Sequence, residues 1–174
     1  LESLHSVASL KVLGYYWERE PIDGETIDRL HVVARSAANP PTYWYRRRED
    51  STTWTAWEKV ECGLDSDILE LHVWNRRLMM CWVKVTTAAA GTDTSNKVHA
   101  VYTLSWSTQR DGKWTAKQHA EEQHVGVSHD EASQMPEMWN YVLIADEKTN
   151  TEALTIWIGR RIPSITDNPD VTYG

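Results

Sequence analysis

The chain has 174 residues, a formal net charge of −7 and an unusual aromatic set of ten Trp, seven Tyr and no Phe. This length suffices for one domain that buries about two thirds of its surface on folding, so residues 1–174 are interpreted as a single domain, and the N-terminal sequence is interpreted as that of a fragment of a longer chain. The negative charge excludes nucleic acid as a partner, because phosphate binding requires clustered Lys and Arg.

The first expected element is a short helical segment, because Leu1, Leu4, Val7 and Leu10 recur at helical spacing until Gly14. After Gly14 the pattern is that of short strands separated by polar turns. The expected strands are 31–37, 42–47, 54–60, 68–74, 78–86, 97–107, 114–119, 141–146 and 153–160. The sequence therefore predicts an all-β fold of antiparallel hairpins, arranged like a propeller or a sandwich.

Two of these strands carry clear burial patterns. The run Leu78 to Val83 is apolar on both faces, which predicts a central strand covered on both sides. It is also the longest apolar run and far shorter than the roughly 20 residues of a membrane span. Val98 to Trp106 alternates apolar residues with His99, Thr103 and Ser105, which predicts a half-exposed antiparallel strand.

Turn residues are expected to join the strands into hairpins. Asp111-Gly112 is a tight-turn signal, and Asn75-Arg76 stands between Trp74 and Leu78, where a residue that tolerates positive φ is useful. Residues 147–152 would close a longer hairpin. The stretch 86–96 is small and polar and is expected to be a loop, and 121–138 is expected to be irregular.

A weak internal repeat follows from two similar segments about 60 residues apart. Each contains an acidic turn and then Trp-Thr-Ala, once at Trp54 and once at Trp114. Such recurrence indicates propeller-like repeats, of which 174 residues would hold only part. Only Cys62 and Cys81 are present; a disulfide between them stays an open alternative, whereas Cys81, inside the apolar run, is favoured as a small buried side chain.

The segment from Thr42 to Val83, with a Tyr-rich strand, W-T-x-W-E and W-N-x-R-L, resembles the neuraminidase-like region of the A subunit of bacterial insecticidal toxin complexes (Tc toxins). A later segment resembles the W-S-x-x-x-D-G-K-W-T pattern of that family. The residues that carry the structural motif are Trp54, Trp57, Glu58, Trp74, Asn75, Arg77, Trp82, Asp111, Gly112 and Trp114. The chain departs from the family at Cys81-Trp82-Val83, which affects strand packing and no catalytic group.

The resemblance implies a structural, non-catalytic domain of a secreted or cell-surface toxin. In the family, this domain helps to close the shell of a homo-oligomeric, pentameric subunit until a pH change opens it. Neighbouring protomers would be the partners, and no cofactor is expected. The alternative is a glycan-binding module for attachment to a host-cell glycan or receptor, since Trp faces stack on sugars; alternation of Trp along the strands favours a core position for at least two thirds of them.

Sialidase chemistry is the weaker alternative. It needs three arginines around a carboxylate, and Arg35, Arg46, Arg77 and Arg160 are available in number. Arginines at strand ends are more often ion-pair partners on the surface. Glu58 beside Trp57 has the residue type of a general acid, but no second carboxylate is placed by a motif, so an ion pair with a neighbouring Arg is favoured.

One segment combines imidazoles with carboxylates, and its residues are the candidates for pH sensing or contact: His119, Glu121, Glu122, His124, His129 and Asp130. Their spacing matches no standard zinc motif, so no metal site is expected. His titrates nearest to neutral pH, and a neighbouring carboxylate can make a contact depend on charge. A solvated loop is the simplest interpretation of this segment.

Overall fold

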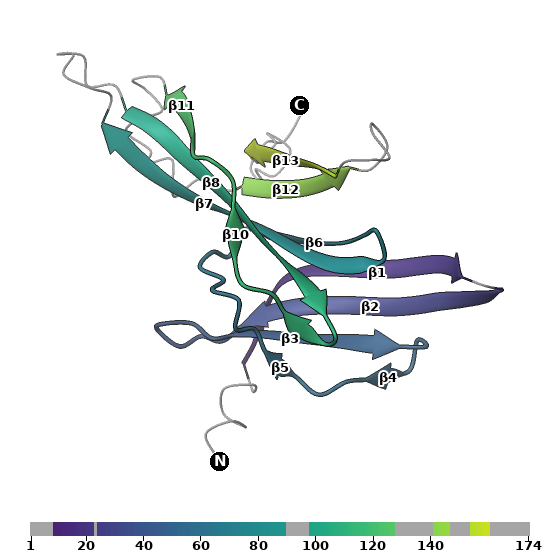
Figure 1. The fold of residues 1–174 in the computed structure, drawn as a ribbon. Coiled ribbons are helices and arrows are strands. Elements are labelled where there is room, and N and C mark those ends of the chain that lie inside the picture. The colour runs from purple at the N-terminus through teal and green to yellow at the C-terminus, as the bar shows by residue number, and fades with distance from the viewer. Residues whose placement is uncertain (1–8, 23, 90–97, 128–140, 147–153, 161–174) are drawn as a thin grey trace, which may run out of the picture.

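The computed structural model describes residues 9–22, 24–89, 98–127, 141–146 and 154–160, and these form antiparallel sheets without a helix (Figure 1). The first sheet contains β1 (Lys11–Ile22), β2 (Glu25–Arg35), β3 (Tyr43–Glu49), β4 (Thr53–Trp54) and β5 (Glu58–Lys59). The second contains β6 (Leu69–Trp74), β7 (Arg77–Ala89), β8 (Val98–Arg110), β9 (Lys113–Trp114), β10 (Gln118–His119) and β11 (Gln123–Val127). The third is the hairpin of β12 (Tyr141–Asp146) and β13 (Thr155–Arg160). The all-β prediction is confirmed.

The main core lies between the first two sheets. Tyr43 and Tyr45 of β3 face Leu71, Met80 and Trp82 of the second sheet, and all five side chains are buried in one cluster. Burial of apolar area at about 25 cal/mol per Å² makes this layer the main source of stability. A smaller cluster around Val83, Ala100 and Leu143 joins the other face of the second sheet to the third. The sheets therefore pack as a sandwich with a third layer.

The strand β7 is central, as its apolar run predicts. It pairs with β6 on one side and with β8 on the other. Its even-numbered residues Leu78, Met80 and Trp82 join the main core, whereas Val83 and Val85 join the smaller cluster. A strand that is covered on both faces cannot alternate between apolar and polar residues, which explains the continuous apolar run.

The internal repeat extends to individual hydrogen bonds. The amide of Thr55 donates to the carbonyl of Arg47 at 2.9 Å, and its hydroxyl accepts from the amide of Arg47 at 3.1 Å. Thr115 makes the same two contacts with Thr108, at 2.9 and 3.1 Å. In both sheets the Trp-Thr-Ala segment interrupts a strand and replaces one backbone acceptor with a Thr hydroxyl.

The repeat continues after each interruption. Val60 donates its amide to Tyr43, and Ala120 donates its amide to Leu104, both at 2.9 Å. The short strands β5 and β10 therefore occupy equivalent places, one at the side of β3 and the other at the side of β8. Each of the first two sheets is a meander whose last strand is interrupted, into β4 and β5 in the first sheet and into β9, β10 and β11 in the second.

The turn predictions are confirmed where the structure describes them. Asn75 and Arg76 form the two-residue turn between β6 and β7, and both have positive φ, at 50° and 59°. Asp111 and Gly112 form the equivalent turn before β9, with φ of 49° and 76°. Two successive positive φ values define the turn whose twist matches an antiparallel hairpin. The β12–β13 pairing agrees with the predicted longer hairpin, whose connection lies outside the described residues.

Two expectations about the strands are corrected. The predicted strands begin at residue 31, yet β1 and the first half of β2 pair over residues 11–35, with a bulge between Val12 and Gly14. The first strand was missed because its inner face carries Glu18 and its outer face is aromatic and charged, so no apolar alternation marks it. The stretch 121–138 was expected to be irregular, but Gln123–Val127 forms β11. The helical segment expected over residues 1–10 lies mainly outside the described residues.

The burial expected for β8 is also wrong. Ser105 and Ser107, on its polar face, are buried at 1% and 0% exposure, whereas Leu104 and Trp106 are only half-buried. The Ser107 hydroxyl donates to the carbonyl of Thr115 at 2.7 Å, which satisfies its polar atom inside the protein. Small hydroxyl side chains therefore fill the space beneath the broken strand.

Cys62 and Cys81 are both buried and free, so the disulfide alternative is not formed. Burial raises the pKa of the Cys81 thiol to about 12, which keeps it a neutral, small side chain as predicted. In the part of the chain that the structure describes, no helix has the length and apolar character to cross a membrane.

Candidate functional site

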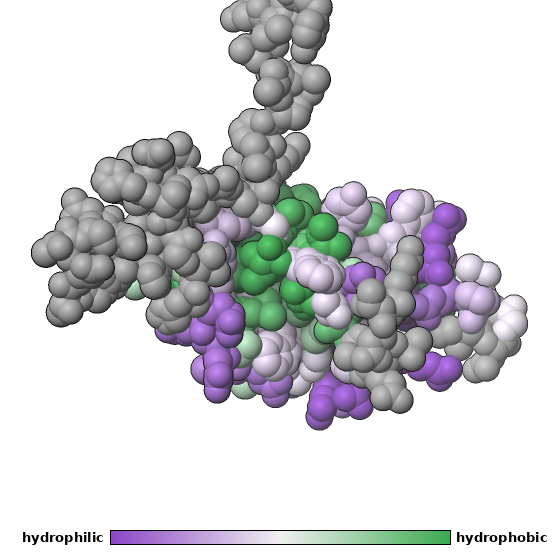
Figure 2. Space-filling model, turned by 90° about the horizontal axis from the view of Figure 1, so that it is seen from above, coloured by the Kyte–Doolittle hydropathy of each residue, from purple (hydrophilic) through white to green (hydrophobic). Residues whose placement is uncertain are grey.

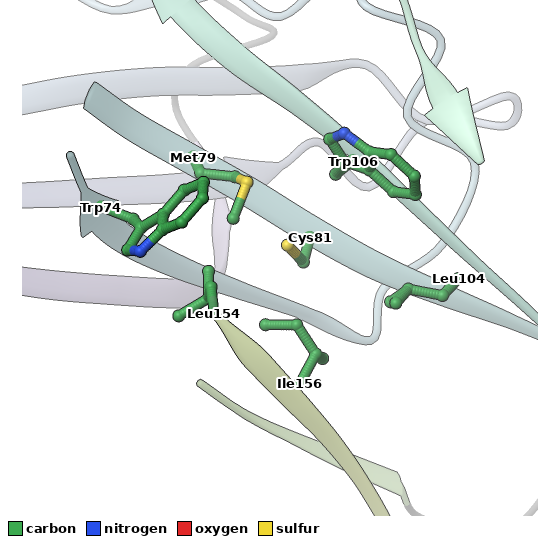
Figure 3. A pocket seen from close by; sticks show the side chains of 7 residues that line it. All are labelled: Trp74, Met79, Cys81, Leu104, Trp106, Leu154 and Ile156. Carbon is green, nitrogen blue, oxygen red and sulfur yellow. The ribbon is translucent and has the colours of Figure 1, made fainter. Parts of the chain in front are cut away.

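An apolar groove lies on the face of the second sheet that is turned toward the third. Its volume is about 390 Å³. Figure 3 shows the lining side chains, which come from β6, β7 and β8, from the start of β13 and from the residue before it: Trp74, Met79, Cys81, Leu104, Trp106, Leu154 and Ile156. All seven of these side chains are uncharged, so among the described residues the groove offers an apolar packing surface.

The third sheet covers this groove and is itself exposed on its other face. Val142, Ile144 and Trp157 are 42%, 53% and 58% exposed, and Ile144 lies opposite Trp157 in the hairpin. Seen from above, the side on which β12 and β13 lie, apolar side chains gather at the centre of the surface between hydrophilic margins (Figure 2). Contiguous exposed apolar side chains commonly mark a contact surface.

Glu70 of β6 lies at the border of these sheets, in a hollow that is also lined by Tyr15 and Leu143. Burial alone raises the pKa of its carboxyl to about 7. Among the described residues, none forms an ion pair or hydrogen bond with this carboxylate. A half-buried carboxylate without a cation is least favourable when ionised, so Glu70 changes charge near neutral pH.

We expect Glu70→Gln to stabilise the protein at pH 8 and to leave it unchanged at pH 4. A carboxyl whose pKa is raised on folding favours the folded state fully below its unfolded value of about 4.5, and this contribution is lost as the pH rises through about 7. Because the side chain is partly exposed, solvent screening reduces the gain at pH 8 to about 1 kcal/mol. Urea unfolding at both pH values measures it, with the exposed Glu61→Gln as the control; an equal effect at both pH values would contradict the assignment.

A buried polar cluster occupies one end of the inner face of the first sheet. His31 is 4% exposed and Glu18 is 7% exposed. His31 Nε2 lies 3.1 Å from Glu18 Oε2, and its Nδ1 lies 2.9 Å from the Tyr45 hydroxyl. The hydrogen bond from His31 holds the pKa of Glu18 below its usual range. Burial raises the pKa of Tyr45 to about 12, so this phenol stays protonated.

The cluster continues toward the surface through two arginines. Arg29 Nη1 lies 3.8 Å from Glu18 Oε2, and Arg29 Nε lies 2.8 Å from Glu49 Oε2. Glu49 also accepts from Arg47 of its own strand. Each carboxylate in the cluster is thereby paired with a cation or imidazole, as buried charges require.

The outer face of the same sheet carries a stack of alternating guanidinium and indole groups, the Arg–Trp ladder: Trp17, Arg19, Arg46, Arg48, Trp54 and Trp57. The Arg46 guanidinium lies 4.1 Å from the Trp54 ring centre and 4.4 Å from that of Trp57. Arg48 lies 5.9 Å from both Trp17 and Trp54. These distances are those of cation–π contacts, so Trp54 and Trp57 hold arginines in place rather than fill the core.

Of the four arginines considered for a sialidase site, the three whose side chains are described are not gathered around one point. Arg35 Nε lies 2.8 Å from Asp67 Oδ2, and Arg46 is stacked between two tryptophans. Arg77 is exposed at the start of β7. The Arg160 side chain is not described. Glu58 is exposed beside half-buried Trp57 in the first sheet, where no described apolar pocket surrounds it.

The segment proposed for pH sensing is only partly described. His119, Glu121 and Glu122 are exposed along β10 and the link to β11. His124 belongs to β11, but its side chain is not described, and His129 and Asp130 lie outside the described residues. In the described part of the chain, no three His, Cys, Asp or Glu side chains gather as metal ligands would. The better placed titratable groups, His31, Glu18 and Glu70, were not singled out from the sequence.

The expectation that most Trp side chains lie in the core is wrong. Among the described tryptophans, only Trp82 is buried, at 0% exposure. Trp114 is half-buried and packs edge-on against Tyr45, with 5.5 Å between ring centres. Trp74 lines the groove. Alternation along a strand shows which residues share a face, but it does not show whether that face is turned toward the core or toward the outside. In the first sheet the shared face of several tryptophans is the outer one, where the ladder lies.

The chain is similar to known proteins both in its sequence family and in its fold. A family model described as the neuraminidase-like domain matches residues 10–161. Among solved structures, the chain is similar to TcdA4 of Morganella morganii, with a TM-score of 0.59, 19% identity and coverage of 83% of this chain and 6% of that one. It also matches TcaA-TcaB of Yersinia pseudotuberculosis, with a TM-score of 0.46, 18% identity and coverage of 72% and 7%. No curated protein sequence matches. The chain thus spans 6% and 7% of these structures, and the likeness to TcdA4 concerns the fold.

Proposed function

Because the chain belongs to the neuraminidase-like domain family, we propose that it is a structural, non-catalytic domain of the A subunit of a Tc toxin. The observation that carries this proposal is the placement of its arginines. A sialidase needs three arginines gathered around one substrate carboxylate, whereas Arg35 is paired with Asp67, Arg46 lies in the ladder on β3, and Arg77 is exposed at the start of β7 in the other sheet. These three guanidinium groups do not converge on one point.

A fluorogenic sialoside tests the non-catalytic role. We expect no turnover above the buffer blank between pH 5 and pH 8, with an authentic sialidase as the positive control. Turnover that disappears in Arg35→Ala or Arg77→Ala would overturn the proposal. Loss in both variants without unfolding, checked by circular dichroism, would identify a real active site.

The role within the subunit that we propose is contact with neighbouring protomers, closing the shell of a pentamer and opening it when the pH changes. Two features support it. The exposed apolar face of β12 and β13 offers a contact surface. Glu70 lies beneath the adjoining layer and changes charge near neutral pH, so ionisation disfavours the packing of that layer. Secretion of the parent toxin accords with this role.

Glycan binding through the ladder is the less favoured alternative. Trp17 and Trp54 are 48% and 39% exposed, but sugar stacking requires an open aromatic face. Arg46 and Arg48 lie over Trp54, and Arg19 and Arg48 lie over Trp17. Guanidinium groups thus compete with sugars for those ring faces.

A further inference from the structure

The arginines of β3 divide into two kinds according to the face on which they lie. On the inner face, Arg47 is paired with Glu49. On the outer face, Arg46 and Arg48 lie opposite Val32 and Leu30 of β2, and in the described part of the chain neither forms an ion pair with a carboxylate. Their Nε atoms are buried and have no hydrogen-bond partner there. The outer face therefore presents two guanidinium groups that form no ion pair with the described carboxylates.

The nearby carboxylate of Asp28 is already occupied. Its Oδ1 accepts from Trp17 Nε1 at 2.6 Å, and its Oδ2 accepts from the Ser51 hydroxyl at 2.6 Å. Arg19 approaches it only to 3.8 Å. Asp28 thus anchors the first indole of the ladder, and its two oxygens are engaged by groups other than Arg46 and Arg48.

The composition of this face is that of a protein interface. Tyr15, 68% exposed, and Trp17 lie on it, opposite Val32 and Leu30, and Trp54 lies opposite Arg48. Trp, Tyr and Arg are the residues that most often dominate binding energy between proteins. Stacking on indole rings restricts the guanidinium groups before binding, which reduces the conformational entropy lost on association.

We propose that the Arg–Trp ladder is a docking site for a protein segment that carries carboxylates. A guanidinium group binds a carboxylate through two parallel hydrogen bonds, and Arg46 and Arg48 are two residues apart on one strand face, so successive outward carboxylates of an extended segment would match their spacing. Trp17 and Trp54, which are 48% and 39% exposed, supply apolar contact beside these charges. Since guanidinium groups already lie over both rings, a segment that carries carboxylates fits this face better than a sugar or a nucleic-acid base does.

A fluorescent decapeptide of glutamate tests the docking site on the full chain, by fluorescence anisotropy. We expect saturable binding at low salt, weakened at least tenfold by Arg46→Gln with Arg48→Gln. Arg76→Gln with Arg77→Gln, which removes two exposed cations from the β6–β7 turn, should leave the affinity within twofold. Binding should also fall in 0.5 M NaCl, where exposed charges are screened.

Three results would overturn the proposal: no binding of the peptide, an equal loss in both double variants, or preference for dextran sulfate over the glutamate peptide at equal charge. Should the ladder variant unfold, Arg48→Lys keeps the charge but loses the planar fork. It should then bind the peptide several-fold more weakly while its melting temperature stays near that of the wild type; unchanged affinity in that variant would count against the site. Sialoside turnover is independent of every one of these outcomes.

Discussion

Replacing Trp82 by Ala is expected to lower the free energy of unfolding by about 3–5 kcal/mol, the range for removal of a large buried aromatic. Trp82 is fully buried between the first two sheets. Its Nε1 donates to Asp65 Oδ1 at 2.8 Å, and Lys117 Nζ lies 5.8 Å from the ring centre and bonds the same carboxylate at 3.1 Å. The substitution leaves both a cavity and a carboxylate that has lost one donor.

Urea unfolding followed by circular dichroism measures this loss, and Trp54→Ala provides the matched control. Trp54 is 39% exposed and contacts the ladder, so its removal should cost about 1 kcal/mol, the value of exposed cation–π contacts. Similar losses for the two tryptophans would show that the layer around Trp82 does not dominate stability. Trp82→Phe should fall between them because it keeps most of the apolar contact.

Removing the carboxylate of Glu18 should have the second largest effect. Glu18→Ala removes the ion-pair partner of His31 Nε2 and one of the two carboxylates that Arg29 contacts. Breaking a buried pair by removing one member costs about 3 kcal/mol. The hydrogen bond from His31 lowers the pKa of Glu18 from its ordinary 4.5. Its contribution is therefore complete above pH 4.5 and is lost as the pH falls through the lower folded value.

The difference in stability between wild type and Glu18→Ala should accordingly be constant from pH 6 to pH 8 and should shrink below pH 4.5. Thermal unfolding across this range gives the profile. Glu61→Ala is the control, because the Glu61 side chain is 76% exposed and only 3.6 Å from Lys59; its effect should stay within about 0.5 kcal/mol. A difference that grows on acidification would mean that Glu18 is protonated in the folded protein.

The strands with strong apolar patterns were predictable from the sequence, and the faces of others were not. The run Leu78 to Val83 identified a strand buried on both sides because only such a strand lacks polar positions. In contrast, β1 carries three successive aromatic residues and then three charged ones, of which only Glu18 is buried. A pair between Glu18 and His31 depends on register across two strands, which periodicity within one strand cannot report.

The site was less predictable than the fold for the same reason. Trp54 and Trp57 were predicted as motif residues. Their distance from Arg46 along the sequence, however, did not predict that its guanidinium group stacks on their rings. Glu70 belongs to no motif and has no distinctive spacing in the sequence. Its raised pKa comes from burial by the layer that packs over β6, and the sequence of β6 alone does not report that burial. Two recurring Trp-Thr-Ala segments, on the other hand, did reveal a repeated hairpin, since the Thr hydroxyl has a local role in both copies.

The broken last strands of the two large sheets have a further consequence for a protein made in many copies. An intact edge strand offers a continuous row of free amides and carbonyls, onto which another chain can add and begin aggregation. Here β4 and β5 are two residues each, as are β9 and β10. At each Trp-Thr-Ala interruption the row is cut to two residues on either side, and in the second sheet β11 continues the border over five residues. A substitution that restored a continuous strand at these places would give the sheet edge a longer row of unpaired amides and carbonyls, to which another chain can add and form fibres.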